Sequence, residues 1–425
     1  MRENWTECCF EDLLDYEQPT KYIVKSTKYN DSYKMPVLTA GKTFIKGYTN
    51  ETEGIFDNLP TIIFDDFTTA TQYVNFKFKV KSSAMKILVP TSKLVNMPLV
   101  YYAMQVNQIR SDTHKRYWIS VFSKKKFLLP PLLEQKAIVS KLDNILNNIN
   151  IGQSDLIKAH NQLKIYRQAV LKKAFDGDFT VNWRAKNLSK DNATEYISNV
   201  REHSEKNKNK KIKVDAKFWA ECTFEDLLDY EQPTNYIVKS TKYNDNYKTP
   251  VLTAGKTFIK GYTNETDGIF DNLPTIIFDD FTTASQFVNF KFKVKSSAMK
   301  ILLPTSELVN MSFVFYAMQL NKIRSDTHKR YWISTYAKKN IYIPSLEEQQ
   351  VIVREIESRL SVCDKIEESI NESLEKAKAL RQSVLKKAFD GTLLNKEEIA
   401  KCKEFKDYEP ASVLLEKIKA EKKQK

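Results

Sequence analysis

Residues 61–81 read TIIFDDFTTATQYVNFKFKVK, and residues 275–295 repeat them almost letter for letter as TIIFDDFTTASQFVNFKFKVK. This pair belongs to a longer repeat. Phe10–Ser120 aligns with Phe224–Ser334 at a constant offset of 214, with no gap and 13 differences in 111 positions. A period this long that occurs twice indicates two domains, whereas a solenoid would show many short repeats.

Local signals inside the repeat predict a mixed α/β domain. Residues 61–64 are apolar enough for a buried strand, and residues 76–81 alternate between apolar side chains and lysines. Asn96 can cap a helix that runs to about Arg110, with Pro98 in its first turn.

Beyond residue 120 the identity falls, but the spacing of apolar residues continues. Pro130, Pro131 and Pro344 precede two segments with apolar residues every three or four positions, which predict long helices of about 60 Å. We expect the two helices to pair antiparallel; the alternative is that each packs only on its own domain. The predicted seam consists of Ile138, Leu142, Ile145, Ile149, Leu156, Leu163, Ile352, Ile356, Leu360, Ile370, Leu374 and Val384.

Composition narrows the class of protein. The chain has 425 residues, of which 42% are hydrophobic, and no apolar run has the length of about 18 residues that a membrane span needs. The five cysteines show no regular spacing, and we expect a reducing cytoplasm. The formal net charge of +14 favours a polyanionic partner such as nucleic acid, although a lysine-rich, solvated surface is the alternative.

Signatures of catalysis are missing from the sequence. No two of the nine glycines are separated by a single residue, so a GxGxxG turn is absent, and so is a phosphate-binding P-loop. The acidic pairs 65–66 and 279–280 lack the acid-x-lysine partner of a magnesium nuclease, which favours a loop or capping role. We therefore predict no catalytic residue, no metal site and no cofactor on this chain.

Several motifs resemble the specificity subunits of type I restriction-modification systems. They are LLPPLLEQ (128–135), YIPSLEEQ (342–349), RQAVLKKAFDG (167–177), RQSVLKKAFDG (381–391), FTVNWR (179–184) and EPASVLLEKI (409–418). The resemblance covers almost the whole chain, in the family's order of domain, helix, domain, helix. One feature departs from the family, because its recognition domains usually differ while here they are nearly identical.

The resemblance implies an α+β fold: two globular target recognition domains separated by a long antiparallel two-helix coiled coil, with pseudo-two-fold symmetry. The expected parts are recognition domain 1 (1–131), spacer helix 1 (132–178), a basic linker (179–216), recognition domain 2 (217–345), spacer helix 2 (346–391) and a C-terminal tail (392–425) packed near the N-terminal domain.

The resemblance also implies a division of labour. Each recognition domain reads one half of a split double-stranded DNA target, and the chain docks two methyltransferase subunits and two restriction subunits. S-adenosylmethionine, ATP and Mg²⁺ are expected on those partners. Near-identical readers related by a two-fold axis predict an interrupted palindrome as target. The rival classes are a stand-alone DNA-binding regulator and a nuclease.

Three clusters in each copy combine cations with polar or aromatic groups and are predicted to contact DNA, together with the lysines of residues 77–81. In the first copy they are Lys42, Thr43, Lys46, Tyr48, Thr68, Thr69, Gln72, Tyr73, Lys77, Lys79, His114, Lys115, Arg116 and Tyr117. In the second copy they are Lys256, Thr257, Lys260, Tyr262, Thr282, Thr283, Gln286, Phe287, Lys291, Lys293, His328, Lys329, Arg330 and Tyr331. A satisfied turn or a solvated rim is the alternative for each cluster.

Overall fold

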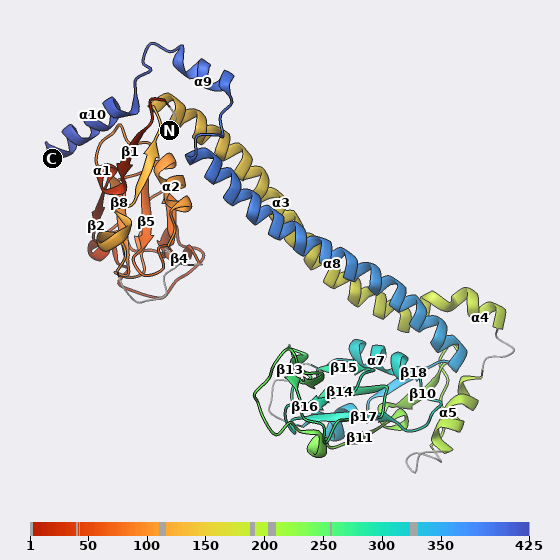
Figure 1. Ribbon diagram of the computed structural model, residues 1–425. Coiled ribbons are helices and arrows are strands. Elements are labelled where there is room, and N and C mark those ends of the chain that lie inside the picture. The colour runs from red at the N-terminus through yellow and green to blue at the C-terminus, as the bar shows by residue number, and fades with distance from the viewer. Residues whose placement is uncertain are drawn as a thin grey trace. The chain divides into compact units, whose positions relative to one another are not determined.

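The computed structural model describes residues 3–39, 41, 43–109, 116–187, 192–202, 210–255, 257–323 and 330–424. It divides into two compact units (Figure 1). Unit 1 consists of Met1–Ile157 and Asn371–Lys425, and unit 2 consists of Lys158–Ile370. Both divisions fall inside long helices, so each unit contains one copy of the repeated domain and one half of each helix.

The domain of unit 1 contains three small sheets. Its elements are β1 (Thr6–Cys9), α1 (Phe10–Leu13), β2 (Leu14–Glu17), β3 (Met35–Leu38), β4 (Ile45–Thr49), β5 (Thr61–Asp65), β6 (Thr71–Val74), β7 (Lys79–Val80), β8 (Met85–Pro90), α2 (Met97–Val106) and β9 (Lys126–Leu129). The strand orders are β2-β8-β5-β6, β4-β3-β7 and β1-β9. A π-helical turn, Trp118–Phe122, follows α2.

The four-stranded sheet separates two apolar cores. Ile62, Phe64 and Leu88 pack on the side of α2. Ile63 and Ile87, one residue along each strand, pack on the side of β3 and β7. Successive side chains of a strand point to opposite faces, so a sheet buried on both faces reads as the continuous apolar run seen at 61–64.

Two predictions for this domain are confirmed and one boundary moves. Strand β5 begins at Thr61 as expected. The Asn96 side chain accepts the Leu99 N–H at 3.2 Å and caps α2. The helix ends at Val106, however, short of the expected Arg110.

Unit 2 repeats the domain at the offset of 214. Its elements are β10 (Ala220–Thr223), α6 (Phe224–Leu227), β11 (Leu228–Glu231), β12 (Thr249–Leu252), β13 (Ile259–Thr263), β14 (Thr275–Asp279), β15 (Ser285–Val288), β16 (Lys293–Val294), β17 (Met299–Pro304), α7 (Met311–Leu320) and β18 (Asn340–Ile343). The strand orders are β11-β17-β14-β15, β13-β12-β16 and β10-β18.

The two long helices are α3 (Leu132–Phe175) and α8 (Leu346–Phe389), of 44 residues each. Within unit 2 they run antiparallel: His160 contacts Glu367 at 3.0 Å, and Arg167, further along α3, contacts the earlier residue Asp364. Each helix is followed by a left-handed glycine, Gly177 (φ 81°) or Gly391 (φ 71°).

The residues of the predicted seam lie where the two long helices pack. All twelve residues are buried or half-buried, and in unit 1 Ile138, Leu142 and Ile149 share a core with Val384. The buried Leu146 also joins this core, although the spacing rule had chosen Ile145. The alternative, in which each helix packs only on its own domain, is therefore wrong within each unit.

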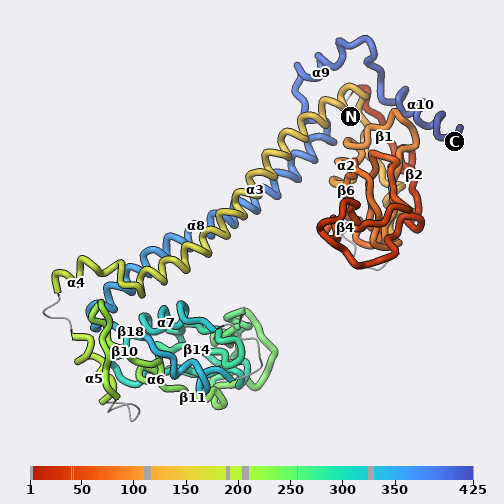
Figure 2. The backbone as a smooth tube through the Cα atoms, turned by 180° about the vertical axis from the view of Figure 1, so that it is seen from behind, coloured from red at the N-terminus to blue at the C-terminus, as the bar shows by residue number. Residues whose placement is uncertain are grey.

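The segment that follows each long helix folds back as a helical strap. In unit 2, α4 (Val181–Asn187) and α5 (Ala193–Glu202) lie in what we expected to be a polar linker, and α5 buries Tyr196, Ile197 and Val200 against the start of the second domain. In unit 1, α9 (Lys396–Lys403) and α10 (Ala411–Lys423) follow, and α10 packs on α1 and β1 (Figure 2).

Candidate nucleic-acid interface

The hairpin between β5 and β6 has a tightly ordered tip. The Asp65 carboxylate oxygen Oδ1 accepts the backbone N–H groups of Phe67 and Thr68, each at 2.9 Å. Thr69 follows with φ 57°, a conformation uncommon for a residue with a side chain. Thr68 is exposed at the tip. Asp279–Thr283 repeats this geometry. The loop role expected for these acidic residues is confirmed.

Thr69 and Thr283 were predicted to contact DNA, and the structure corrects this. Both side chains are buried, at 1% and 2% exposure. The Thr69 hydroxyl donates to the backbone oxygen of Ile109 at 3.0 Å, and Thr283 donates to that of Ile323 at 2.8 Å. These hydroxyls fix the chain just after α2 and α7 instead of facing solvent.

Asp66, in the same hairpin tip, binds the backbone of the chain that follows Arg116. Its carboxylate oxygen Oδ1 accepts the Trp118 N–H at 2.8 Å, and its backbone oxygen accepts the Tyr117 N–H at 2.9 Å. Arg116 precedes this pair, is exposed, and forms no ion pair within the described residues. Arg116 and Tyr117, the described residues of the third predicted cluster, therefore lie at the same edge of the domain as the hairpin tip of the second cluster.

A buried lysine, Lys86, contacts the Asp66 carboxylate from inside the domain. The Lys86 ammonium lies 3.9 Å from Asp66 Oδ2 and 4.8 Å from the centre of the Tyr16 ring, and only 3% of the residue is exposed. Burial lowers the pKa of Lys86, with Asp66 opposing the shift and Arg116 adding to it. Sequence reasoning missed this pair, because Lys86 sits in an apolar run and only strand pairing places it beside Asp66.

Gln72 and Tyr73 lie on opposite faces of β6. The Tyr73 ring packs against Tyr101 of α2, with ring centres 5.9 Å apart, and Phe287 packs against Phe315 of α7 in the same way. The rings of Tyr73 and Phe287 are therefore partly buried against the hydrophobic core of their domains. Gln72 and Gln286 are half-buried on the other face.

In the first predicted cluster, Lys46 and Tyr48 lie on β4, and Lys260 and Tyr262 lie on β13. Thr43, Lys46, Thr257 and Lys260 are exposed, and Tyr48 and Tyr262 are half-buried. A Cβ on Gly47 would lie 2.6 Å from the Tyr29 side chain, so this glycine accommodates the protein's own ring.

Lys79 and Lys293 are wrong as DNA contacts. Each is 1% exposed, and Lys79 Nζ donates to the backbone oxygens of Glu53 and Gly54 and pairs with Glu51 at 3.2 Å. The alternation in 76–81 suggested a lysine face, but β7 pairs with β3 and its lysine points inward. Lys77 and Lys291 do stay exposed, beside Asp57 and Asp271.

Of the remaining predicted DNA contacts, some lie among the described residues and others lie outside them. Arg330 is exposed and Tyr117 and Tyr331 are half-buried; Thr282 is exposed at its hairpin tip. Lys42, His114, Lys115, Lys256, His328 and Lys329 lie outside the described residues. Across the described ranges no group of three or more metal-ligating side chains occurs. No helix there combines the length and apolar character that crossing a bilayer requires.

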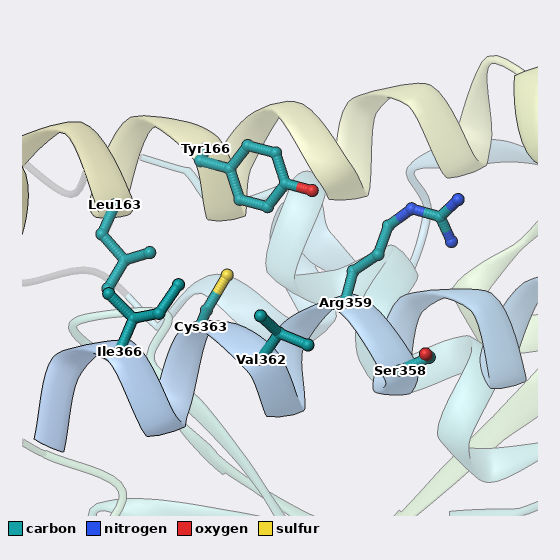
Figure 3. A pocket seen from close by; sticks show the side chains of 7 residues that line it. All are labelled: Leu163, Tyr166, Ser358, Arg359, Val362, Cys363 and Ile366. Atoms are coloured by element: carbon teal, nitrogen blue, oxygen red, sulfur yellow. The ribbon is translucent and has the colours of Figure 1, made fainter. Parts of the chain in front are cut away.

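Unit 2 also has an apolar groove between its helix halves (Figure 3). Leu163 and Tyr166 of α3 face Val362, Cys363 and Ile366 of α8 across a volume of about 370 Å³. Tyr166, Val362 and Ile366 are about half exposed. At the equivalent places in unit 1 the sequence has Leu380, Asn148 and Gly152, which are less apolar as a set.

Comparison with known proteins agrees with this architecture. The chain is 46% identical over 174 residues to the type I restriction enzyme EcoR124I/EcoR124II specificity subunit of Escherichia coli, a match that covers 38% of this chain and 43% of that relative. It is 26% identical to the EcoDI specificity subunit of Escherichia coli over 69% of this chain and 68% of the relative. The chain therefore spans less than half the length of the first of these relatives.

A solved structure supports the fold. A chain from a study of complex assembly and conformational transition of the type I R-M system matches with a TM-score of 0.64 and 12% identity, over 92% of this chain and 99% of that one. The family model for the type I restriction modification DNA specificity domain matches twice, at residues 2–159 and 217–376. The chain belongs to the type I restriction-modification DNA specificity family.

Proposed function

We propose that this chain is the DNA-reading subunit of a type I restriction-modification complex and supplies no chemistry of its own. The observation that carries the proposal is the edge present in both domains: an exposed arginine, Arg116 or Arg330, beside a tight hairpin tip that ends in Thr68 or Thr282. An arginine reads guanine or holds phosphate, and a threonine contacts thymine or phosphate. The net charge of +14 favours the encounter with DNA.

The near-identity of the two domains indicates the form of the DNA target. The two edges differ by no residue between 65 and 70 or between 279 and 284, so they should prefer the same bases. With α3 and α8 antiparallel, as they are in unit 2, the readers would meet opposite strands, and the target would be an interrupted palindrome. Helices of about 60 Å would separate the halves by somewhat under two duplex turns.

Mapping of methylated adenines in cells that carry the complete system tests this target. We expect one site made of two inverted copies of the same short sequence. Two unrelated half-sites, or a direct repeat, would contradict the proposal.

The proposed partners are two methyltransferase subunits and two restriction subunits, which would bring S-adenosylmethionine, ATP and Mg²⁺. The exposed apolar side chains on the helices, Tyr166, Val362 and Ile366 among them, support a docking role. A tagged chain should co-purify with two methyltransferase subunits per chain. Tight, specific DNA binding by the chain alone, without such subunits, would favour a stand-alone regulator instead.

A further inference from the structure

The pair Lys86–Asp66 occupies an unusual position for two charges. Both residues are almost fully buried, Lys86 at 3% and Asp66 at 4%, and unit 2 repeats them as Lys300 and Asp280 with an Nζ–Oδ2 distance of 3.6 Å. A buried ion pair adds little stability compared with apolar residues of the same size, so a gain in stability does not account for this pair.

Asp66 connects the pair to the exposed edge. One of its carboxylate oxygens accepts the Trp118 N–H, while the other faces Lys86. Its backbone oxygen accepts the Tyr117 N–H. The two residues after Arg116 are therefore held by Asp66. The same two bonds hold Tyr331 and Trp332 after Arg330, at 2.9 and 2.8 Å from Asp280.

Lys86 is held in turn by groups that leave its ammonium little freedom. It lies on β8 opposite Phe64 of β5, and the Tyr16 ring lies over the ammonium. In unit 2 the Tyr230 ring lies 4.1 Å from the Lys300 ammonium. Removing the lysine would leave the aspartate charge buried without its cation, and the carboxylate would protonate or turn toward water. Either change would loosen the backbone that carries the arginine.

We propose that Lys86 and Lys300 are positioning residues for DNA reading: through Asp66 and Asp280 they fix the direction in which Arg116 and Arg330 project. This inference rests on the proposed function. The lysines themselves touch no DNA, because they are buried. Their contribution is geometric, since bidentate recognition of a base tolerates little displacement of the guanidinium.

The test compares full-length variants in the complex with methyltransferase subunits. Binding is measured to a duplex with the mapped site and to a scrambled duplex, over a range of salt concentrations. For Lys86→Met with Lys300→Met we expect the preference for the site to fall by about tenfold per domain, hence about a hundredfold in total. The slope of affinity against salt should stay unchanged, because both arginines remain available for phosphate.

A matched control comes from the other buried lysines. Lys79→Met with Lys293→Met also removes one buried cation per domain, at β7 and β16, away from the arginine edge. It should lower the melting temperature and leave the site preference intact. Equal preference in the Lys86 and Lys79 variants would overturn the positioning role.

Two further variants separate the possible failures. Arg116→Ala with Arg330→Ala should lower both the preference and the salt slope; if it changes neither, the proposed function is wrong at this edge and the positioning role falls with it. Should the methionine variant fail to fold, Asp66→Asn with Asp280→Asn keeps an acceptor for the Trp118 N–H, removes the negative charge and turns an NH2 group, which cannot accept, toward the lysine. Unchanged preference in that variant would also overturn the positioning role.

Discussion

The two units hold almost identical domains with different straps. In unit 2, α5 offers Arg201, whose Nη2 lies 2.9 Å from Asp226 Oδ2, and the side chains are 3% and 0% exposed. In unit 1, α10 offers Lys419, whose Nζ lies 3.1 Å from Asp12 Oδ1, and the side chains are 46% and 22% exposed. Asp12 and Asp226 are equivalent in the repeat, so the strap decides how deeply the same aspartate is buried.

The straps correspond to each other residue by residue. Ala193, Tyr196, Ile197, Val200 and Arg201 match Ala411, Leu414, Leu415, Ile418 and Lys419 at a constant offset of 218, whereas the domains repeat at 214. A planar, weakly hydrated guanidinium suits the buried pair, and a strongly hydrated ammonium suits the exposed one. The two straps therefore pack on their domains with equivalent apolar residues, but one forms a buried ion pair and the other an exposed one.

The largest expected effect follows from that difference. Arg201→Met leaves Asp226 buried without this cation and should destabilise the start of the second domain by about 3–5 kcal/mol. Lys419→Met should cost less than about 1 kcal/mol, because its ion pair is exposed. Hydrogen exchange of β10 and β1 reports the two local opening free energies in the full chain. Equal losses would show that burial does not distinguish the straps.

A second comparison concerns DNA reading. Arg116→Ala and Arg330→Ala, made separately, should each weaken binding to the mapped site by about 1–3 kcal/mol, and by equal amounts. Equality is expected because the two edges have the same sequence and the same hydrogen bonds. Titration of labelled site DNA measures both, and a clearly larger loss for one arginine would mean that the straps alter the reading edges.

A smaller effect is expected on the helices. Gly152 lies in α3 where a Cβ would meet no atom within 4 Å, whereas the equivalent residue in α8 is Ile366. Gly152→Ala should stabilise unit 1 by about 0.5–1 kcal/mol, since alanine loses less conformational freedom in a helix. Thermal unfolding of the full chain checks the sign. A loss of stability in Gly152→Ala would indicate a close neighbour at this position.

The smallest effect is expected from the exposed lysines. Lys77→Ala with Lys291→Ala should change stability by less than about 0.5 kcal/mol, because the ion pairs with Asp57 and Asp271 are exposed. Affinity should fall uniformly for site and scrambled DNA, with a shallower dependence on salt. A change in site preference would instead place these lysines at base edges.

Local sequence determined several elements and where they start. The Asn96 cap, the buried strand at 61–64 and the start of the long helices after Pro131 and Pro344 follow from side-chain chemistry within a few residues. The repeat determined that two domains exist. These features depend on neighbours in the chain, so a single sequence is enough to predict them.

Only the tertiary structure decided which polar residues face solvent. Lys79, Lys86 and Thr69 are as hydrophilic in sequence as Lys77 and Thr68, yet strand pairing and the turn at the hairpin tip bury the first three. The helical strap in residues 192–202 was missed for a similar reason. Its apolar side chains become buried only when they pack on the second domain. Burial is set by what packs on a residue, and those partners lie tens to hundreds of positions away in the chain.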